Sequence, residues 1–234
     1  MNHTLINPSL MKHVGLTIVA GGLATLWAQT GFAVNSSACP GTANRLCLYS
    51  PVDPAGSKGS QSLAVGIGVT SGESSAIPSS QVNPATQIPE QVFRAHVTKG
   101  LAVPVDLGMI LGSSETGQFQ QAGVHAQWTI FEGFRLPAVT ARAALLRSSW
   151  ARGGDILEMA SINSRNIELL GSWGVLGILT PYAGVGWAEV GNDSTIQNFI
   201  GLEIQALPPF MRLGIESRKA FSNRYVLAKI SLGL

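Results

Sequence analysis

Charged side chains are scarce in this chain. Asp, Glu, Lys and Arg make up only 12% of its 234 residues, about half the share found in an ordinary soluble domain. The formal net charge is +2, and the Lys and Arg residues are scattered, which excludes an electrostatic nucleic-acid-binding surface. Glycine, by contrast, is abundant, with 27 residues. This composition favours either a membrane protein or a buried, β-rich one.

Long apolar runs are also missing, apart from one near the start. A short basic stretch precedes an apolar run from Val14 to Ala28, and small residues follow up to Ala33. This order is typical of a secretory signal peptide and predicts that residues 1–33 are removed after Ala33. The run is shorter than the roughly 20 apolar residues that a spanning helix needs, so an uncleaved anchor is the weaker interpretation. Because no second run follows, a helical membrane protein is excluded.

Cysteine occurs only twice, as Cys39 and Cys47 in "SSACPGTANRLCLYSP". In the oxidising compartment that a signal peptide implies, these two residues are predicted to form a disulfide bond. No neighbouring Cys or His completes a metal site, so we expect no metal ion. We expect residues 34–61 to form a periplasmic N-terminal segment, with this disulfide loop, beneath the domain that follows.

From residue 62 to the C-terminus, one pattern recurs: short runs in which every second residue is apolar. Turn residues separate the runs, and the longest connection, rich in Ser, Pro and Gln, follows the first run. Such runs are typical of half-buried β-strands. The predicted strands are Leu63–Val69, Phe93–Val97, Val105–Leu111, Ala122–Ile130, Val139–Leu145, Leu157–Leu169, Ala183–Trp187, Ile196–Ile204, Met211–Ile215 and Val226–Leu234.

One face of nearly every predicted strand is apolar, and the other is polar and rich in small residues. We interpret residues 62–234 as a closed antiparallel up-and-down transmembrane β-barrel that turns its apolar face to lipid, because an open sheet edge would leave backbone groups unpaired there. Ten strands are favoured over eight. An even number places the first and the last strand terminus of the barrel on the same side, in the periplasm. The sixth run leaves one question open. Its register points Asn163 and Arg165 toward lipid, so either they lie above the membrane or a bulge reverses the face.

The polar face carries the ionisable residues that we expect to line the lumen. Positive and negative groups are nearly equal in number, whereas a selective pore usually concentrates one sign. We therefore expect them to pair and to fill a narrow interior. This predicted lumen charge network consists of Arg94, His96, Asp106, His125, Arg142, Glu158, Glu168, Glu203, Arg212, Glu216, Arg218 and Lys229.

These residues give little support for a catalytic site. Only His96 and His125 lie beyond the N-terminal region, and no Ser stands two residues from either of them. Asp106 is the one candidate partner, so hydrogen-bonded lumen histidines are the simpler interpretation. We expect no enzyme activity and no cofactor. A set of aromatic residues near the inner strand ends is expected to form an interfacial girdle, namely Trp128, Phe131, Phe134, Trp173, Tyr182 and Phe210.

The stretches "PVDLGMILG", "GVHAQWTIFEGF" and "LTPYAGVGW", with the alternating C-terminus, resemble small bacterial outer-membrane β-barrels of the OmpA/OmpW-like kind. The resemblance implies insertion into outer-membrane lipid by the barrel-assembly machinery, which reads the C-terminal strand. Such strands usually end in an aromatic residue, whereas this one ends in Leu234.

The predicted function is a structural or surface-interaction role for an outer-membrane barrel. Two alternatives stay open at the level of the sequence. One is a small passive diffusion channel for small solutes. The other is a soluble, exported β-sandwich binding module, because the strands of a sandwich alternate in the same way.

Overall fold

The structure is a computed structural model, and it describes residues 34–35, 47–48, 51–60, 62–72, 91–115, 119–133, 137–152, 155–175, 178–208, 210–221 and 223–233. Residues Val34–Leu234 belong to one compact unit. The predicted signal peptide lies outside the described residues, and so do Cys39 and Phe134.

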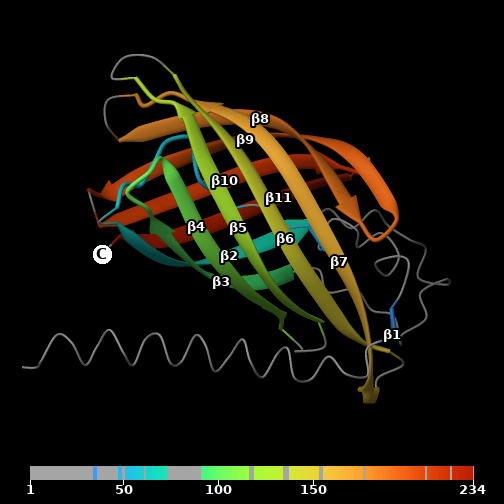
Figure 1. Ribbon diagram of the computed structural model, residues 1–234. Helices are drawn as coiled ribbons and strands as arrows, with labels where there is room; N and C mark the ends of the chain where they lie inside the picture. Colours follow the sequence, from blue (N-terminus) through green and yellow to red (C-terminus); the bar gives the residue numbers. More distant parts are fainter. Residues whose placement is uncertain are drawn as a thin grey trace, which may run out of the picture. The chain divides into compact units, whose positions relative to one another are not determined.

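The described part of the chain forms eleven β-strands. They are β1 (Val34–Asn35), β2 (Leu63–Gly72), β3 (Gln91–Gly100), β4 (Val105–Ser114), β5 (Phe119–Phe131), β6 (Ala138–Arg152), β7 (Asp155–Ser172), β8 (Leu179–Val190), β9 (Asp193–Leu207), β10 (Met211–Ala220) and β11 (Asn223–Gly233). Strands β2 to β11 close into one antiparallel barrel in which each strand pairs with its neighbours along the chain (Figure 1). The predicted up-and-down barrel is confirmed, with ten strands rather than eight.

The last strand closes the barrel. β11 pairs with β10 on one side and with β2 on the other, from Tyr225 opposite Gly72 to Gly233 opposite Ala64. Its outward side chains Val226, Ile230 and Leu232 are exposed. A C-terminal strand with one apolar face is therefore explained by its position, because it seals the ring and turns that face outward.

Side chains are distributed inside out around the barrel. Large apolar residues project from the exterior of the wall, and Ile196 reaches 80% exposure. Polar and charged side chains are buried on the opposite face of the same strands, for example Gln197 next to Ile196. This distribution fits a barrel in lipid and rules out the β-sandwich alternative, since the strands form one closed ring.

No helix among the described residues is long and apolar enough to cross a membrane.

The barrel has two distinct ends. We call the end where β2 begins and β11 finishes the terminal end, and the opposite end the loop end. The loop end carries the long connection between β2 and β3. The predicted strand Val139–Leu145 stops well short of this end, but β6 continues to Arg152 and β7 begins at Asp155. Strand pairing between β6 and β7 persists there, which makes this hairpin longer than the alternation of apolar residues suggested.

Strand β7 is the longest, with 18 residues. Its pairing with β8 begins only at Ser164, so its first residues extend past β8 toward the loop end. Asn163 and Arg165 lie on its exposed face together with Ile167, and the alternation between them is unbroken. No bulge reverses the face here. Arg165 instead forms an exposed ion pair with Glu189 at 2.9 Å and lies over the ring of Trp187.

Four of the predicted girdle residues are exposed near the terminal end: Trp128, Phe131, Trp173 and Phe210. The prediction for Tyr182 is wrong, because this residue is only 3% exposed. It faces the lumen opposite Gly201, and the absence of a side chain at that glycine gives the phenol ring its space.

Candidate functional site

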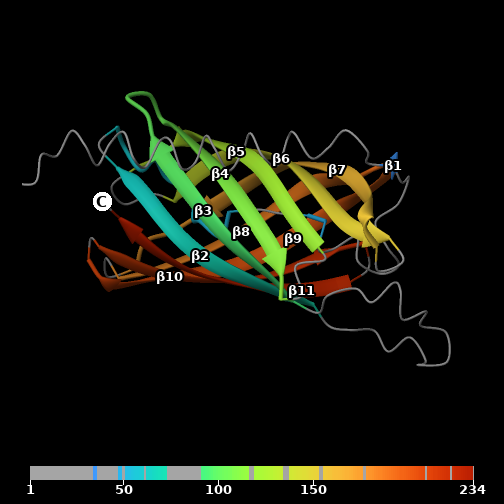
Figure 2. The same ribbon diagram turned by 90° about the horizontal axis from the view of Figure 1, so that it is seen from below.

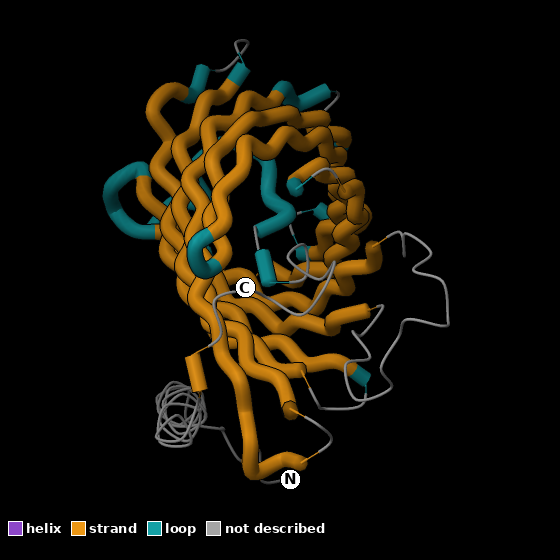
Figure 3. Tube along the Cα trace, turned by 90° about the vertical axis from the view of Figure 1, so that its right-hand side faces the viewer, coloured by secondary structure: helices purple, strands orange, loops and turns teal. Residues whose placement is uncertain are grey.

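The chain that precedes β2 runs through the interior of the barrel. We call it the lumen segment and define it as the described residues 47–48 and 51–60. Figure 3 looks into the barrel and shows loop structure inside the ring of strands. We predicted a segment beneath the barrel, and that location is wrong for these residues. The physical reason is that the lumen satisfies the backbone groups of the segment and buries its apolar side chains.

At the terminal end, the lumen segment is held by three strands or their turns. The backbone N–H of Lys58 donates to both carboxylate oxygens of Asp106 on β4, at 3.2 Å each. The N–H of Ser57 donates to Glu132, which follows β5, at 3.1 Å. Lys99 on β3 donates to the carbonyl of Ser60 at 2.8 Å.

Farther toward the loop end, side chains of the wall bind carbonyl groups of the segment. Arg94 of β3 donates to the carbonyl of Leu48 at 3.3 Å and also to Gln121 at 3.0 Å. The hydroxyl of Ser164 on β7 donates to the carbonyl of Cys47. The segment therefore contacts opposite walls of the barrel along its course.

The middle of the segment is anchored by backbone and by charge. Gln127 of β5 donates to the carbonyls of Pro54 and Gly56, at 3.2 and 3.0 Å. Gly56 has a φ of +127°, a conformation that favours glycine, and its N–H donates to Thr140 at 3.1 Å. Arg142 of β6 donates to the carbonyl of Asp53 at 3.1 Å and to that of Pro51.

Asp53 is the charged anchor of the lumen segment. Its carboxylate forms ion pairs with Lys229 of β11 and with Lys58 of the segment itself, the latter at 2.9 Å. Asp53 is only 3% exposed, and a buried charge of this kind is tolerated when it is paired with opposite charges.

Glycine residues create the space that this anchor occupies. Lys229 pairs with Gly214 of β10 on one side and with Gly68 of β2 on the other. A Cβ atom at Gly214 would lie 3.0 Å from Cγ1 of Val52 in the lumen segment. Glycine thus leaves space on the inner face of the wall where the segment passes.

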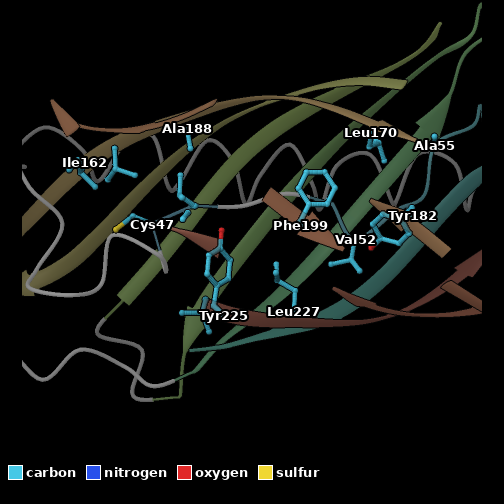
Figure 4. Packing of buried hydrophobic residues seen from close by; sticks show 14 of the residues in the cluster. Cys47, Val52, Ala55, Ile162, Leu170, Tyr182, Ala188, Phe199, Tyr225 and Leu227 are labelled. Atoms are coloured by element: carbon cyan, nitrogen blue, oxygen red, sulfur yellow. The ribbon is translucent and has the colours of Figure 1, made fainter. Parts of the chain in front are cut away.

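Apolar side chains of the segment join a buried cluster inside the barrel. Cys47, Leu48, Val52 and Ala55 belong to it together with inward residues of several strands, including Leu227 (Figure 4). Cys47 is fully buried, whereas Cys39 lies outside the described residues, so the Cys39–Cys47 disulfide stays a prediction. Burial of this apolar surface favours retention of the segment in the lumen.

A second group of charges forms a compact network against one side of the wall. Arg142 of β6 pairs with Glu168 of β7 at 2.6 Å, and Arg218 of β10 pairs with Glu216 at 2.7 Å and with Glu168. Each of these four side chains is at most 1% exposed. Two arginines and two glutamates therefore balance each other in the interior.

Neutral groups complete this network. Asn166 and Gln197 donate to Glu168 at 2.9 Å each, and Tyr182 donates to Glu216 at 3.1 Å. The ring of Phe199 lies 4.3 Å from the guanidinium carbon of Arg218, within the range of a cation–π contact. A buried carboxylate bound in this way is costly to disturb, because removal of one partner leaves the other charge unpaired.

The predicted histidines are buried in the wall rather than arranged for catalysis. The ring of His96 lies over Gly66 of β2, where an added Cβ would come 2.5 Å from Nε2. His125 lies over Gly108 of β4 in the same way, and its Nε2 is 3.4 Å from the hydroxyl of Thr98. Asp106, the one candidate partner, is bound instead to the backbone of Lys58.

The remaining residues of the predicted lumen charge network are Glu203, Arg212 and Glu158. Glu203 is buried on β9 and lies 3.8 Å from Arg212 of β10, whose side chain is 33% exposed and thus lies at the margin of the lumen. The side chain of Glu158 lies outside what the structure describes. No group of three or more metal-ligating side chains occurs among the described residues.

Asp53 and Lys58 are the functional residues that the sequence did not reveal. The stretch around them, "SPVDPAGSKGS", contains no alternation of apolar residues. One signal could have been used: Lys229 has glycine on both neighbouring strands and therefore lacks a carboxylate across the sheet. A buried cation without a partner in its own wall requires a partner from elsewhere.

The contact between Tyr182 and Gly201 gives a first prediction. An added Cβ at Gly201 would lie 2.6 Å from Cε1 of Tyr182 and closer still to Cζ. We therefore expect Gly201→Ala to lower the free energy of unfolding by about 1–3 kcal/mol, as overpacking does. Urea unfolding in lipid vesicles, followed by the loss of the heat-modifiable band on electrophoresis, measures it.

Gly171→Ala is the matched control, because its added Cβ would meet only the carbonyl oxygen of Ala138, at 3.8 Å. Equal unfolding midpoints for the two variants would contradict the packing interpretation.

Known proteins similar to this chain are found among solved structures. No protein-family model and no curated protein matches this chain. Among solved structures it is similar to a KdgM porin, with 9% identity, a TM-score of 0.43, and coverage of 74% of this chain and 99% of that one. It is also similar to the β domain of the Bordetella autotransporter BrkA, with 12% identity, a TM-score of 0.42, and coverage of 76% and 98%.

A third similar structure is the N-terminal β-barrel domain of Pseudomonas aeruginosa OprF, with 6% identity, a TM-score of 0.36, and coverage of 76% of this chain and all of that one. At such identities the likeness concerns the fold alone. The OmpA/OmpW-like assignment therefore stays a prediction.

Proposed function

We propose that this chain is an outer-membrane β-barrel whose lumen is closed by its own N-terminal segment, and that it has a structural or surface-interaction role rather than that of an open channel. The observation that carries the proposal is the lumen segment, which is bonded to side chains from β3, β4, β5, β6, β7 and β11.

The outer-membrane assignment is supported by the wall of the barrel. Its exterior is apolar, its edges are closed, and its strands are long enough to span a tilted path through lipid. Export by the predicted signal peptide fits this location. We also infer that the barrel-assembly machinery engages β11, the strand that closes the ring.

The chemistry of the interior supports a filled lumen. The charges there are balanced, and they are engaged with one another or with the backbone of the segment. A path for ions would require either a water-filled gap or an excess of one charge. The histidines lie over glycines in the wall, which supports the prediction that the protein is not an enzyme.

Conductance in planar lipid bilayers tests the proposal. The purified, folded protein is expected to insert without producing current steps at neutral pH. Insertion is verified independently by heat-dependent migration of the protein recovered from vesicles. Steady current steps from the unmodified protein would support the passive diffusion channel instead and overturn the closed lumen.

A further inference from the structure

The contacts of the lumen segment show the direction in which it runs. β2 begins at the terminal end, and immediately before it Ser60 and Ser57 contact Lys99 and Glu132, which both lie at that end. Traced back from there, the chain passes Asp53 in the middle of the barrel and reaches Cys47 beside Ser164, where β8 ends. The chain therefore enters the lumen from the loop end.

Strand β1 gives a second, independent indication. Val34 and Asn35 pair in parallel with Ala160 and Ser161 of β7. These partners belong to the part of β7 that extends past β8 toward the loop end, because pairing with β8 starts only at Ser164. In Figures 1 and 2 the C-terminus lies at one end of the barrel and β1 at the other.

The loop end is the end that fits the cell exterior. Barrels of this class have both termini of the barrel in the periplasm and their longer connections outside. The long connection from 73 to 90 and the extension of β6 and β7 are all at the loop end. The exposed aromatic residues Trp128, Phe131, Trp173 and Phe210 mark the opposite interface.

We propose that the mature N-terminus of this protein is displayed on the cell surface. Cleavage after Ala33 would make Val34 the first residue, and Val34 pairs with the outer extension of β7. The lumen segment then acts as a tether that crosses the outer membrane inside the barrel and carries the N-terminus outward. This inference rests on the proposed outer-membrane location, and it adds a surface element that a partner outside the cell can contact.

The arrangement has a physical rationale. A two-residue strand such as β1 is too short to be stable alone, but β7 offers it an edge without a partner at this point. Covering that edge also reduces the exposure of unpaired backbone groups, which would otherwise invite pairing with other chains. The tether is fixed at Asp53 and at the terminal end, so it cannot simply slide out of the lumen.

Cysteine labelling of intact cells tests the display. We would compare Asn35→Cys with Glu115→Cys, an exposed position at the loop end, and with Val103→Cys, an exposed position at the terminal end. The unmodified chain, with its own two cysteines, gives the background. A membrane-impermeant maleimide is expected to label Asn35→Cys and Glu115→Cys equally in intact cells, and Val103→Cys only after the outer membrane is permeabilised.

Labelling of Glu115→Cys but not of Asn35→Cys in intact cells would overturn the direction of the tether. Labelling of Val103→Cys in intact cells would overturn the orientation of the barrel, and with it the display. An epitope inserted after Asn35 and detected by antibody on intact cells gives the same answer without reliance on a thiol. Neither readout depends on conductance. An open lumen together with a surface-exposed N-terminus would therefore contradict the proposal of a closed lumen and leave the display of the N-terminus supported.

Discussion

Replacing Asp53 by lysine is expected to open the lumen and to produce steady current steps in planar bilayers. The carboxylate of Asp53 holds Lys229 and Lys58 together inside the barrel. Its replacement by an ammonium group would leave three cations side by side inside the barrel. Loss of one partner of a buried ion pair costs about 3–5 kcal/mol, which corresponds to a shift of roughly 10²- to 10⁴-fold in the ratio of closed to open lumen.

The exchange of both charges provides the internal control for this result. In the double variant Asp53→Lys/Lys229→Asp, a carboxylate on β11 again faces two ammonium groups, so we expect the current steps to disappear. Asp193→Lys changes the net charge by the same amount at an exposed position at the start of β9, and it should stay closed. A folded Asp53→Lys barrel that conducts no current would contradict the role of Asp53 as the anchor of the segment.

Replacing Glu168 by alanine is expected to have the largest effect on stability. Glu168 accepts hydrogen bonds from Arg142 at 2.7 Å and from Gln197 at 2.9 Å, and it also pairs with Arg218. Without it, the nearest carboxylate to Arg142 among the described side chains is that of Glu216, at 3.9 Å. We expect the free energy of unfolding to fall by about 3–5 kcal/mol, measured by urea unfolding in lipid vesicles.

Glu189→Ala is the matched control, since Glu189 also pairs with an arginine on the neighbouring strand, at 2.9 Å. That pair is on the exterior, and the side chain of Arg165 is 59% exposed. Exposed pairs contribute about 0–1 kcal/mol, so this variant should unfold near the midpoint of the unmodified protein. Equal losses in the free energy of unfolding for Glu168→Ala and Glu189→Ala would show that burial of the network does not increase its contribution to stability.

Several strand residues of the candidate site were predictable from the sequence. Arg94, Asp106, Glu216 and Lys229 were assigned to the lumen from alternation alone, and each is buried there. Alternation works for these residues because successive side chains of a strand point to opposite faces. Alternation also assigns Arg165 to the exterior. A charged side chain on this face is explained by the length of β7 and by the ion pair of Arg165 with Glu189.

Tyr182 shows where the same reasoning fails. An aromatic residue near a strand end suits an interfacial girdle, but its direction depends on register, and here it faces Gly201 inside the barrel. The lumen segment shows a deeper limit. Asp53 and Lys58 lie in a stretch without periodicity, so no local pattern indicates that it lies inside the barrel.

The sequence by itself determined that this chain forms a closed barrel with an apolar exterior and a charged, balanced interior. Those properties follow from a period of two repeated over ten strands, which is a local quantity. Only the tertiary structure decided what fills the interior and from which end. That outcome depends on a cation, Lys229, whose partner is 176 residues away along the chain. Contacts over such a separation are fixed by the closure of the barrel and leave no trace in any short stretch of sequence.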